Sequence, residues 1–266
     1  MKRLSYITIM AALLLAGCTG KTHKIAITAH RGFWTCEQAG YMENTIASLA
    51  QAQENGFWGS EFDVHITGDD QLLVNHNADL GGLNIHDTPI DSFLVMVHKN
   101  GEHPSTVGQY LEQGAKGGAM LVYEIKPNPS EEKENLLVDK TIETLKEHCM
   151  YDPDKVMFIS FSLNICKRIA EKCPGFTNQF LADDEFYLTP DEVHAAGING
   201  IDYEYHMFYS HPEWIARAHE LGMSVNVWTV DAKEDMQAMI DLGVDCITTN
   251  YPLLARELLG ERELKR

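Results

Sequence analysis

The chain has 266 residues, of which 39 are acidic and 21 are Lys or Arg, and its formal net charge at pH 7 is −18. A hydrophobic content of 44% with 23% charged residues is ordinary for a globular protein and excludes a largely disordered chain. The length suits one large domain or two small ones. So acidic a chain should not bind nucleic acid or an anionic bilayer through its general field, and an anionic substrate would need a local cluster of positive charge.

The first residues have the pattern of an export signal. Two basic residues near the start precede an apolar stretch, 6–16, that is too short to span a bilayer. The stretch leads into Leu-Ala-Gly-Cys, which resembles the lipobox of bacterial lipoproteins, where cleavage precedes a cysteine that becomes lipidated. We predict a signal peptide over 1–17, a lipid anchor on Cys18 and a polar tether over 18–24. The chain would then be an exported, membrane-anchored lipoprotein on a periplasmic or cell-envelope face, and an ordinary signal peptide with a chance cysteine is the alternative.

The rest of the chain alternates apolar runs typical of strands with amphipathic runs typical of helices. The alternation favours parallel strands joined by helices, and its length favours a closed barrel over an open sheet. We therefore predict an α/β fold, a TIM-type (β/α)8 barrel over 25–256, with a C-terminal tail over 257–266. The strand-like runs are 25–29, 60–66, 71–75, 120–125, 155–160, 177–182, 199–205, 223–229 and 245–249.

Nine strands are one too many for an eight-stranded barrel, and the second and third runs explain the surplus. Only a short polar turn separates 60–66 from 71–75, which is too short for the crossover that parallel strands need. The two runs should therefore form an antiparallel β-hairpin at the barrel mouth. Because side chains alternate along a strand, Glu61 and Asp63 share one face, and the second arm returns His76 towards them.

Further polar side chains fall at the carboxyl ends of predicted strands, where the active sites of α/β barrels form. The first strand is followed by His30 and Arg31, and the run 120–125 brings Glu124 and Lys126 to one face. Charge at the end of an apolar strand is unfavourable unless it is paired or functional. Structural ion pairs could explain each residue singly, but their combination at one mouth predicts an active site.

The residue types at this mouth predict metal-assisted cleavage of a phosphodiester. Three converging carboxylates, Glu61, Asp63 and Glu124, would repel one another and therefore imply a cation. All-oxygen ligands suit a hard ion, Ca²⁺ or Mg²⁺. The Arg and the Lys suit a phosphate oxygen. Two histidines, His30 and His76, could give and take protons near neutral pH.

Several short motifs follow one another between His30 and Pro252: HRG, ENT at 43–45, EFDV, the returning histidine, EIK, the Ser-Phe pair at 160–161, and VWTV at 227–230. In this order they resemble the glycerophosphodiester phosphodiesterase family, which has a barrel of the phospholipase C-like phosphodiesterase kind. The resemblance implies hydrolysis of a small molecule, a glycerophosphodiester, to glycerol 3-phosphate and an alcohol. It also implies three sets of residues: the metal ligands Glu61, Asp63 and Glu124, the acid–base pair His30 and His76, and the phosphate-binding Arg31 and Lys126.

The chain departs from the pattern of this family at several places, among them a long aromatic loop between HRG and ENT. Met42 stands where a proline is common, and Asn77 stands where an aspartate usually follows the second histidine. An asparagine cannot supply a carboxylate that polarises His76. The loop-rich segment 77–105 takes the place of an insertion that caps the site in family members. Its shortness predicts a mouth that is open or covered by a partner.

Other residues near these motifs have two interpretations. Glu43 and Asn44 either support the site from behind or begin a helix, for which Asn44 is a suitable N-cap. Trp228 either packs in the barrel or forms a wall for the glycerol or the leaving group. We predict surface or loop positions for the remaining histidines that have no evident partner: His65, His86, His103, His206, His211 and His219.

Two other functions remain open at this point. A phospholipase C- or D-like enzyme that cuts intact or lyso-phospholipid at a membrane would need an exposed apolar rim, for which Phe33, Trp34 and Tyr41 are candidates. A non-catalytic barrel that binds phosphate esters would not need two histidines beside three carboxylates, so we favour the enzyme. No feature of the sequence identifies a protein partner.

Overall fold

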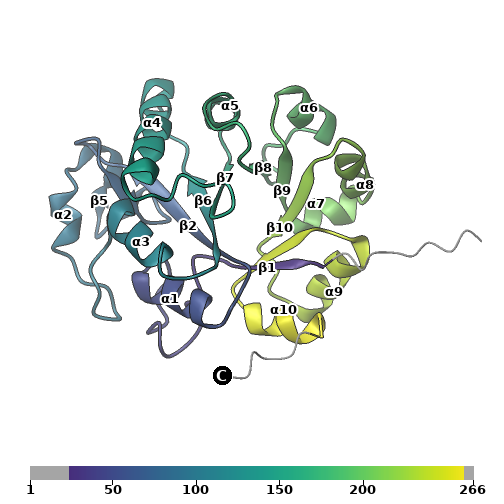
Figure 1. Cartoon of the computed structure of the whole chain (residues 1–266), viewed down its shortest axis with the longest axis horizontal. Coiled ribbons are helices and arrows are strands. Elements are labelled where there is room, and N and C mark those ends of the chain that lie inside the picture. Colours follow the sequence, from purple (N-terminus) through teal and green to yellow (C-terminus); the bar gives the residue numbers. More distant parts are fainter. Residues whose placement is uncertain (1–23, 261–266) are drawn as a thin grey trace, which may run out of the picture.

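The computed structural model describes residues 24–260, so the predicted signal peptide, Cys18 and most of the predicted tether lie outside the described residues. Strands at the centre of the molecule are surrounded by helices (Figure 1). The strands are β1 Ala26–Ala29, β2 Gly59–Ile66, β3 Leu72–Val74, β4 Asp79–Leu80, β5 Leu83–Asn84, β6 Met120–Ile125, β7 Val156–Ser160, β8 Asn178–Ala182, β9 Gly200–Glu204, β10 Ser224–Trp228 and β11 Cys246–Thr249. The α-helices are α1 Ile46–Glu54, α2 Asp91–Leu94, α3 Val107–Gly114, α4 Glu131–Glu147, α5 Leu163–Lys172, α6 Pro190–Ala195, α7 Tyr205–Ser210, α8 Glu213–Glu220, α9 Lys233–Leu242 and α10 Pro252–Leu258.

Eight parallel strands close into a barrel, which confirms the predicted TIM-type fold. The order is β1-β11-β10-β9-β8-β7-β6-β2, and β1 also pairs with β2, so the sheet has no open edge between them. Each of the nine predicted strands forms, with ends that differ from the prediction by at most one residue. The last helix, α10, runs past residue 256 into the range predicted as a tail. Within residues 24–260, no helix is both long and apolar enough to cross a membrane.

The predicted hairpin is also confirmed. β3 runs antiparallel to β2, with Val74 opposite Val64 and Leu72 opposite Ile66. Between the strands, the Thr67 amide donates to the Gln71 carbonyl over 2.9 Å and closes the turn. Both strands are buried, so the alternation of their side chains fixes the register of the pair.

The first helix begins one residue later than Asn44 would require as its N-cap. Thr45 is the N-cap of α1, and it forms a capping box with Ser48, in which each side chain binds the backbone amide of the other residue. Asn44 is therefore not needed to cap the helix. Its own side chain is free to turn into the barrel.

The inside of the barrel has an apolar half and a polar half. Side chains from β6, β7 and β8 form the apolar half, which contains Val122, Met157, Ile159 and Leu181. On the opposite side, Asn226 of β10 donates to Asp202 of β9 over 2.8 Å and to Thr248 of β11 over 3.0 Å. The two largest apolar clusters lie outside the sheet, between strands and helices.

The segment 77–105 packs beside the hairpin at the outer edge of the molecule. It contains the short pair β4–β5, a 3-10 helix over Ile85–Asp87 and α2, which lies at the left edge of Figure 1. Its buried Ile85, Ile90 and Phe93 form one cluster with Leu73 of β3. Within residues 24–260, this segment contributes no side chain to the lining of the cavity that contains His30, Glu61 and Glu124.

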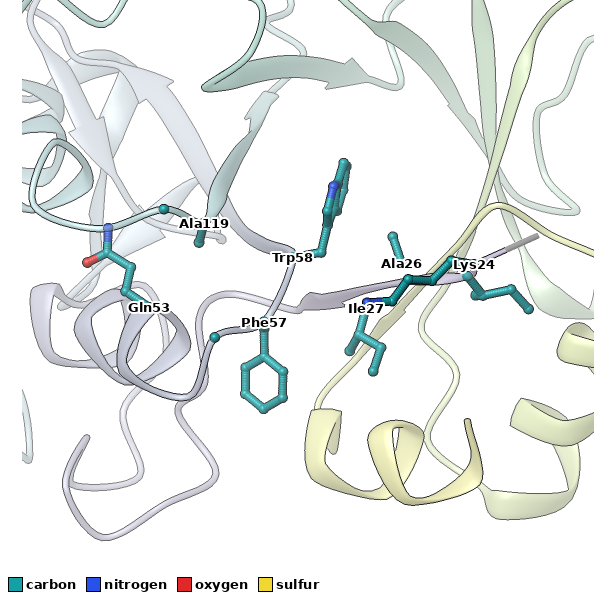
Figure 2. Close-up of a pocket in the computed structure, with 10 residues that line it drawn as sticks. Lys24, Ala26, Ile27, Gln53, Phe57, Trp58 and Ala119 are labelled. Carbon is teal, nitrogen blue, oxygen red and sulfur yellow. The ribbon is translucent and has the colours of Figure 1, made fainter. Parts of the chain in front are cut away.

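A cavity of about 520 Å³ lies at the amino-terminal ends of β1, β2 and β6, next to Lys24 (Figure 2). In this region Phe57 and Trp58 point to opposite sides of the chain that enters β2. The lining is mostly apolar or small, and Lys24 is its one ionisable side chain among the described residues. The volume of a cavity alone therefore does not identify the functional site, because the carboxylate, Arg, Lys and His side chains lie together at the other end of the barrel.

Candidate active site

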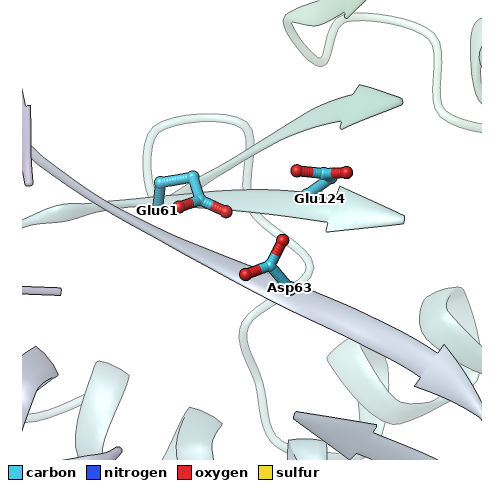
Figure 3. Close-up of side chains that lie close together, drawn as sticks. All are labelled: Glu61, Asp63 and Glu124. Atoms are coloured by element: carbon cyan, nitrogen blue, oxygen red, sulfur yellow. The ribbon is translucent and has the colours of Figure 1, made fainter. Parts of the chain in front are cut away.

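Three carboxylates from two neighbouring strands meet inside the barrel. Glu61 and Asp63 come from β2, and Glu124 comes from β6, where it is the register partner of Asp63. All three are buried, and one oxygen from each lies within 4.8 Å of the others. Figure 3 shows the carboxylates turned towards one another. Within the described part of the chain, Oε1 of Glu61 is buried and has no hydrogen-bond partner.

Burial and mutual repulsion dominate the electrostatics of this acidic triad. Burial, with the neighbouring charges of Asp63 and Glu124, raises the pKa of Glu61 well above its usual range. Burial also raises the pKa of Glu124 to about 7. At Asp63 burial acts in the same direction, but the positive neighbours, Lys126 first, hold the pKa below its usual range. The triad fits a hard divalent cation, because its donors are carboxylate oxygens and one of them is uncommitted.

Two basic side chains border the triad. The Lys126 ammonium lies 2.7 Å from Oδ1 of Asp63 and 2.7 Å from Oε1 of Glu124. Burial works against its charge, but these carboxylates raise the pKa of Lys126 above its usual value, so it stays protonated. The backbone amide of Arg31 donates to Glu61 over 2.7 Å, while its guanidinium Nε lies 3.7 Å from Asp63. Positive charge therefore lies directly beside the candidate cation site.

The turn after β1 explains why glycine follows Arg31. Arg31 has φ 56° and Gly32 has φ 79°, so the chain takes two successive left-handed conformations. A Cβ on Gly32 would also meet the side chain of Ser48 and would lie 2.7 Å from its carbonyl carbon. Glycine thus allows α1 to pack against the turn that carries His30 and Arg31.

The orientation of His30 is fixed by residues from the other end of the chain. Asn250, which follows β11, donates its amide to Asp231 over 2.7 Å, so its Oδ1 faces the Nδ1 of His30 at 2.9 Å. Trp34 also donates to this oxygen, over 3.1 Å. His30 therefore carries its hydrogen on Nδ1, and its Nε2 accepts from Arg31 over 3.2 Å. Burial, and then Arg31, lower the pKa of His30 to about 4.

His76 lies two residues after the end of β3 and reaches the same cavity from the hairpin. Its Nδ1 lies 2.9 Å from Oδ1 of Asn77, and burial lowers its pKa. The ring of His65 donates from Nε2 to the backbone carbonyl of His76 over 3.0 Å. The prediction that His65 is a surface or loop residue is therefore wrong. His65 is 4% exposed, because it lies on β2 beneath the returning arm of the hairpin.

Glu43 and Asn44, which were predicted to support the site, form hydrogen bonds to Arg31 and Asp63. Glu43 accepts from the Arg31 guanidinium over 2.9 Å. Asn44 donates to Oδ2 of Asp63 over 2.7 Å and accepts from the Asp63 backbone amide over 3.2 Å. Of the two interpretations of Asn44, the structure thus favours contact with the triad over helix capping.

These side chains surround one cavity of about 160 Å³ at the carboxyl ends of the strands. Trp228 lies in its wall, edge-on to Phe161 with ring centroids 5.5 Å apart, and donates from Nε1 to the Asp202 carbonyl. Trp228 therefore both packs in the barrel and faces the cavity. Asp63 lies behind the lining, against Asn44 and Lys126. The lining residues are His30, Arg31, Glu61, His76, Glu124, Lys126, Ile159, Phe161, Leu181, Asp202, Trp228, Thr229 and Thr248.

Sequence reasoning missed three polar residues at this mouth. Asn250 and Asp231 orient His30, and Asp202 lines the cavity. A signal was present for two of them. Asn250 directly follows a strand, as His30 does, and Asp202 is an acid that stands between Ile201 and Tyr203 inside a predicted strand.

Comparison with known proteins agrees with this geometry. The model of the glycerophosphoryl diester phosphodiesterase family matches residues 30–254. A glycerophosphodiester phosphodiesterase of Caldanaerobacter subterraneus subsp. tengcongensis is 27% identical over 247 residues, which span 86% of this chain and 95% of that protein.

Solved structures give the same result. A glycerophosphodiester phosphodiesterase from Parabacteroides distasonis is 35% identical, with a TM-score of 0.84 over 90% of this chain and 98% of that one. An Oleispira antarctica phosphodiesterase in complex with the product sn-glycerol-3-phosphate is 21% identical, with a TM-score of 0.77 over 88% and 96% of the two chains. The chain belongs to the glycerophosphodiester phosphodiesterase family and is an enzyme that hydrolyses phosphoric diesters.

Proposed function

We propose that this enzyme splits glycerophosphodiesters into glycerol 3-phosphate and an alcohol, using one divalent cation, Ca²⁺ or Mg²⁺, and two histidines. The observation that carries the proposal is the grouping of two histidines, an Arg, a Lys, Glu61 and Glu124 around one cavity, with Asp63, the third member of the acidic triad, directly behind its lining. The Oleispira antarctica phosphodiesterase, which binds sn-glycerol-3-phosphate as its product, supports the choice of substrate.

Glu61, Asp63 and Glu124 would hold the cation. When bound, the cation would supply Lewis-acid stabilisation of charge on the phosphoryl oxygens. Arg31 can present its planar guanidinium to a phosphate, and Lys126 adds a second positive charge beside the triad. Together these residues would hold an anionic ester in a chain whose overall charge repels it.

His30 and His76 would move the protons. Cleavage requires one proton to leave the attacking oxygen and another to reach the leaving alkoxide. His30 has an unprotonated Nε2 directed by Asn250, and its lowered pKa favours the neutral base. His76 is the more exposed of the two and is held by Asn77 at the mouth, where the alcohol would leave, so it is our candidate for the acid.

The proposal is tested by single substitutions measured for both turnover and cation binding. His30→Ala and His76→Ala should each lower kcat by roughly 100-fold or more on glycerophosphocholine, which is the usual scale for one proton-transfer group. Calorimetry should find cation binding in both variants. Glu124→Gln should instead weaken cation binding strongly, because it removes a charge at nearly constant shape.

His194→Ala is the matched control, since His194 is exposed on α6 and should leave both measurements unchanged. Full turnover in the presence of a chelator would contradict the role of the cation. Loss of cation binding in His76→Ala would make that histidine a ligand.

The phospholipase alternative loses part of its support in the structure. Of the three aromatic residues considered for an apolar rim, Phe33 is buried and packs edge-on against Phe57. Trp34 donates to Asn250, and Tyr41 is the one of the three with an exposed side chain. A small soluble diester therefore suits this mouth better than a lipid in a bilayer.

We also propose that the enzyme is exported and anchored by lipid on Cys18. Support comes from the sequence pattern alone, because residues 1–23 lie outside the described part of the structure. Cleavage of glycerophosphodiesters at the cell envelope would release phosphate esters and head groups from degraded lipid.

A further inference from the structure

One carboxylate that lines the catalytic cavity, that of Asp202, has only one of its two oxygens in a hydrogen bond within residues 24–260. Asp202 lies on β9 and is 1% exposed. Its Oδ2 accepts from Asn226 over 2.8 Å, but within the described residues its Oδ1 is buried without a hydrogen-bond partner. A buried oxygen left unpaired costs free energy, so its presence in a native site calls for a partner.

The position of Asp202 indicates which part of a substrate could supply that partner. The cavity has a charged side, with Arg31 and Lys126, and an apolar wall that includes Leu181 and Trp228. Asp202 is in register with Asn226 and two residues before the end of β9, so it lies one layer deeper in the barrel than Trp228. A substrate held by its phosphate on the charged side would reach Asp202 with an arm that runs along the apolar wall.

The other polar groups beside this wall are less suited to receive that arm. Thr248 shares its hydroxyl with Asn226, as both donor and acceptor. Thr229 follows the end of β10 and therefore lies nearer the mouth. Among the residues that the structure describes, Asp202 thus offers a deep, uncommitted side-chain oxygen next to the apolar wall of the cavity.

We propose that Asp202 determines specificity for the glycerol arm by hydrogen bonding to its terminal hydroxyl group. This inference rests on the proposed function. A carboxylate accepts a hydrogen bond from a hydroxyl, and a protonated carboxylic acid can also donate one, so the contact forms in either state. A cavity of about 160 Å³ with a polar floor suits a short polyol, whereas the leaving alcohol would extend towards the mouth.

The test compares two diesters that differ by this hydroxyl. One is glycerophosphocholine, and the other is the same phosphocholine ester of propane-1,2-diol, which lacks the terminal hydroxyl. Wild-type enzyme should favour the glycerol ester in kcat/KM by about tenfold or more, the scale of one buried hydrogen bond. In Asp202→Ala the preference should fall to less than about threefold.

Gln179→Leu is the matched control. Gln179 also has a buried side-chain oxygen without a partner in the described chain, but it lines a different cavity, at the opposite end of the barrel. It should keep the wild-type preference. An equal preference in Asp202→Ala and wild type, or no preference in wild type, would overturn the inference.

A second measurement does not depend on how well the variant folds. In a crystal of the wild-type enzyme with glycerol 3-phosphate, the terminal hydroxyl oxygen should lie within hydrogen-bond distance of Asp202. A terminal oxygen directed elsewhere would overturn the inference. Failure of the wild-type enzyme to cleave either ester with Ca²⁺ or Mg²⁺ would instead contradict the proposed function.

Discussion

Asparagine side chains orient both histidines of the site. Asn250 accepts from Nδ1 of His30, and Asn77 lies at the same distance, 2.9 Å, from Nδ1 of His76. An amide oxygen fixes the ring without adding the negative charge that would stabilise an imidazolium. Asn77 stands where the family usually has an aspartate. It therefore still orients the ring of His76, but it lacks the negative charge that an aspartate would place beside that ring.

This difference predicts a shift in pH dependence. In Asn77→Asp a carboxylate would replace the amide beside His76 and would favour the protonated ring, so the pKa of His76 should rise. If His76 is the acid, the high-pH limb of the kcat/KM profile should move to higher pH, while the low-pH limb stays in place. Asn77→Ala should not move the limb upward. If the pH profile of Asn77→Asp matched that of the wild type, His76 would not be the group that donates the proton.

Asp202 also predicts how stability depends on pH. Burial raises its pKa to about 8, so between its usual value of 3.8 and this value the folded protein binds one more proton at this residue than the unfolded chain does. The free energy of unfolding should therefore fall as the pH rises from 3.8 to about 8, by up to about 1.4 kcal/mol per pH unit for this one group. Asp202→Asn cannot titrate and should lose less stability than wild type from pH 5 to pH 8. Denaturant curves with a chelator present measure this, and parallel pH dependences would show that Asp202 is ionised in the fold.

The site residues that were predictable either have close neighbours in sequence or lie at the carboxyl ends of parallel strands, as Glu124 does. Glu61 and Asp63 share a face by strand alternation, and the short turn returns His76 to them. The network behind His30 was not predictable in the same way, because Asn250 is 220 positions away in the chain. Contacts across the closure of a barrel depend on the register between its first and last strands, which hydrophobic patterns do not fix.

At the scale of elements, the strands were the easiest part to predict. They are short apolar runs bounded by turns, and in a parallel barrel they are buried on both faces. The start of α1 was harder, because Asn44 and Thr45 are both good N-caps and the interaction of Asn44 with Asp63 decides between them. The segment 77–105 was harder still. Its few apolar side chains show no clear period until they are seen against Leu73.

The turn between β1 and α1 gives a prediction about close packing. In Gly32→Ala the left-handed conformation and the contact with Ser48 should both oppose the new methyl group, and we expect a loss of about 1–3 kcal/mol in the free energy of unfolding. Because His30 and Arg31 belong to the same turn, kcat should fall as well. Gly82→Ala is the matched control, since Gly82 has a similar φ of 81° but open space around it. Gly82→Ala should lower the free energy of unfolding by less than Gly32→Ala does, and it should leave kcat unchanged. If the two substitutions had equal effects, the left-handed backbone alone would explain the effect at Gly32, and the contact with Ser48 would contribute nothing.

At the scale of the whole molecule, the two ends of the barrel have different surroundings. The catalytic cavity lies at the carboxyl ends of the strands, and Lys24 borders the cavity at their amino-terminal ends (Figure 2). Six residue steps join Cys18 to Lys24, which allows a span of roughly 20 Å when fully extended. A lipid on Cys18 would therefore hold the amino-terminal end of the barrel near the membrane. The catalytic mouth would face away from the lipid and towards water.

This arrangement predicts that anchoring and catalysis are separable. Cys18→Ser removes the sulfur that a lipid thioether needs, so the protein should carry no lipid and should be found as a soluble form or as an uncleaved precursor. With the mouth directed towards water, as we propose for the anchored form, kcat/KM for glycerophosphocholine should be the same within about twofold for the wild-type protein in vesicles and for a soluble form beginning at Lys24. Phosphatidylcholine in the same vesicles should not be cleaved. Faster cleavage of vesicle lipid by the anchored form than by the soluble form would mean that the mouth reaches the bilayer. The phospholipase function would then be favoured over hydrolysis of soluble glycerophosphodiesters.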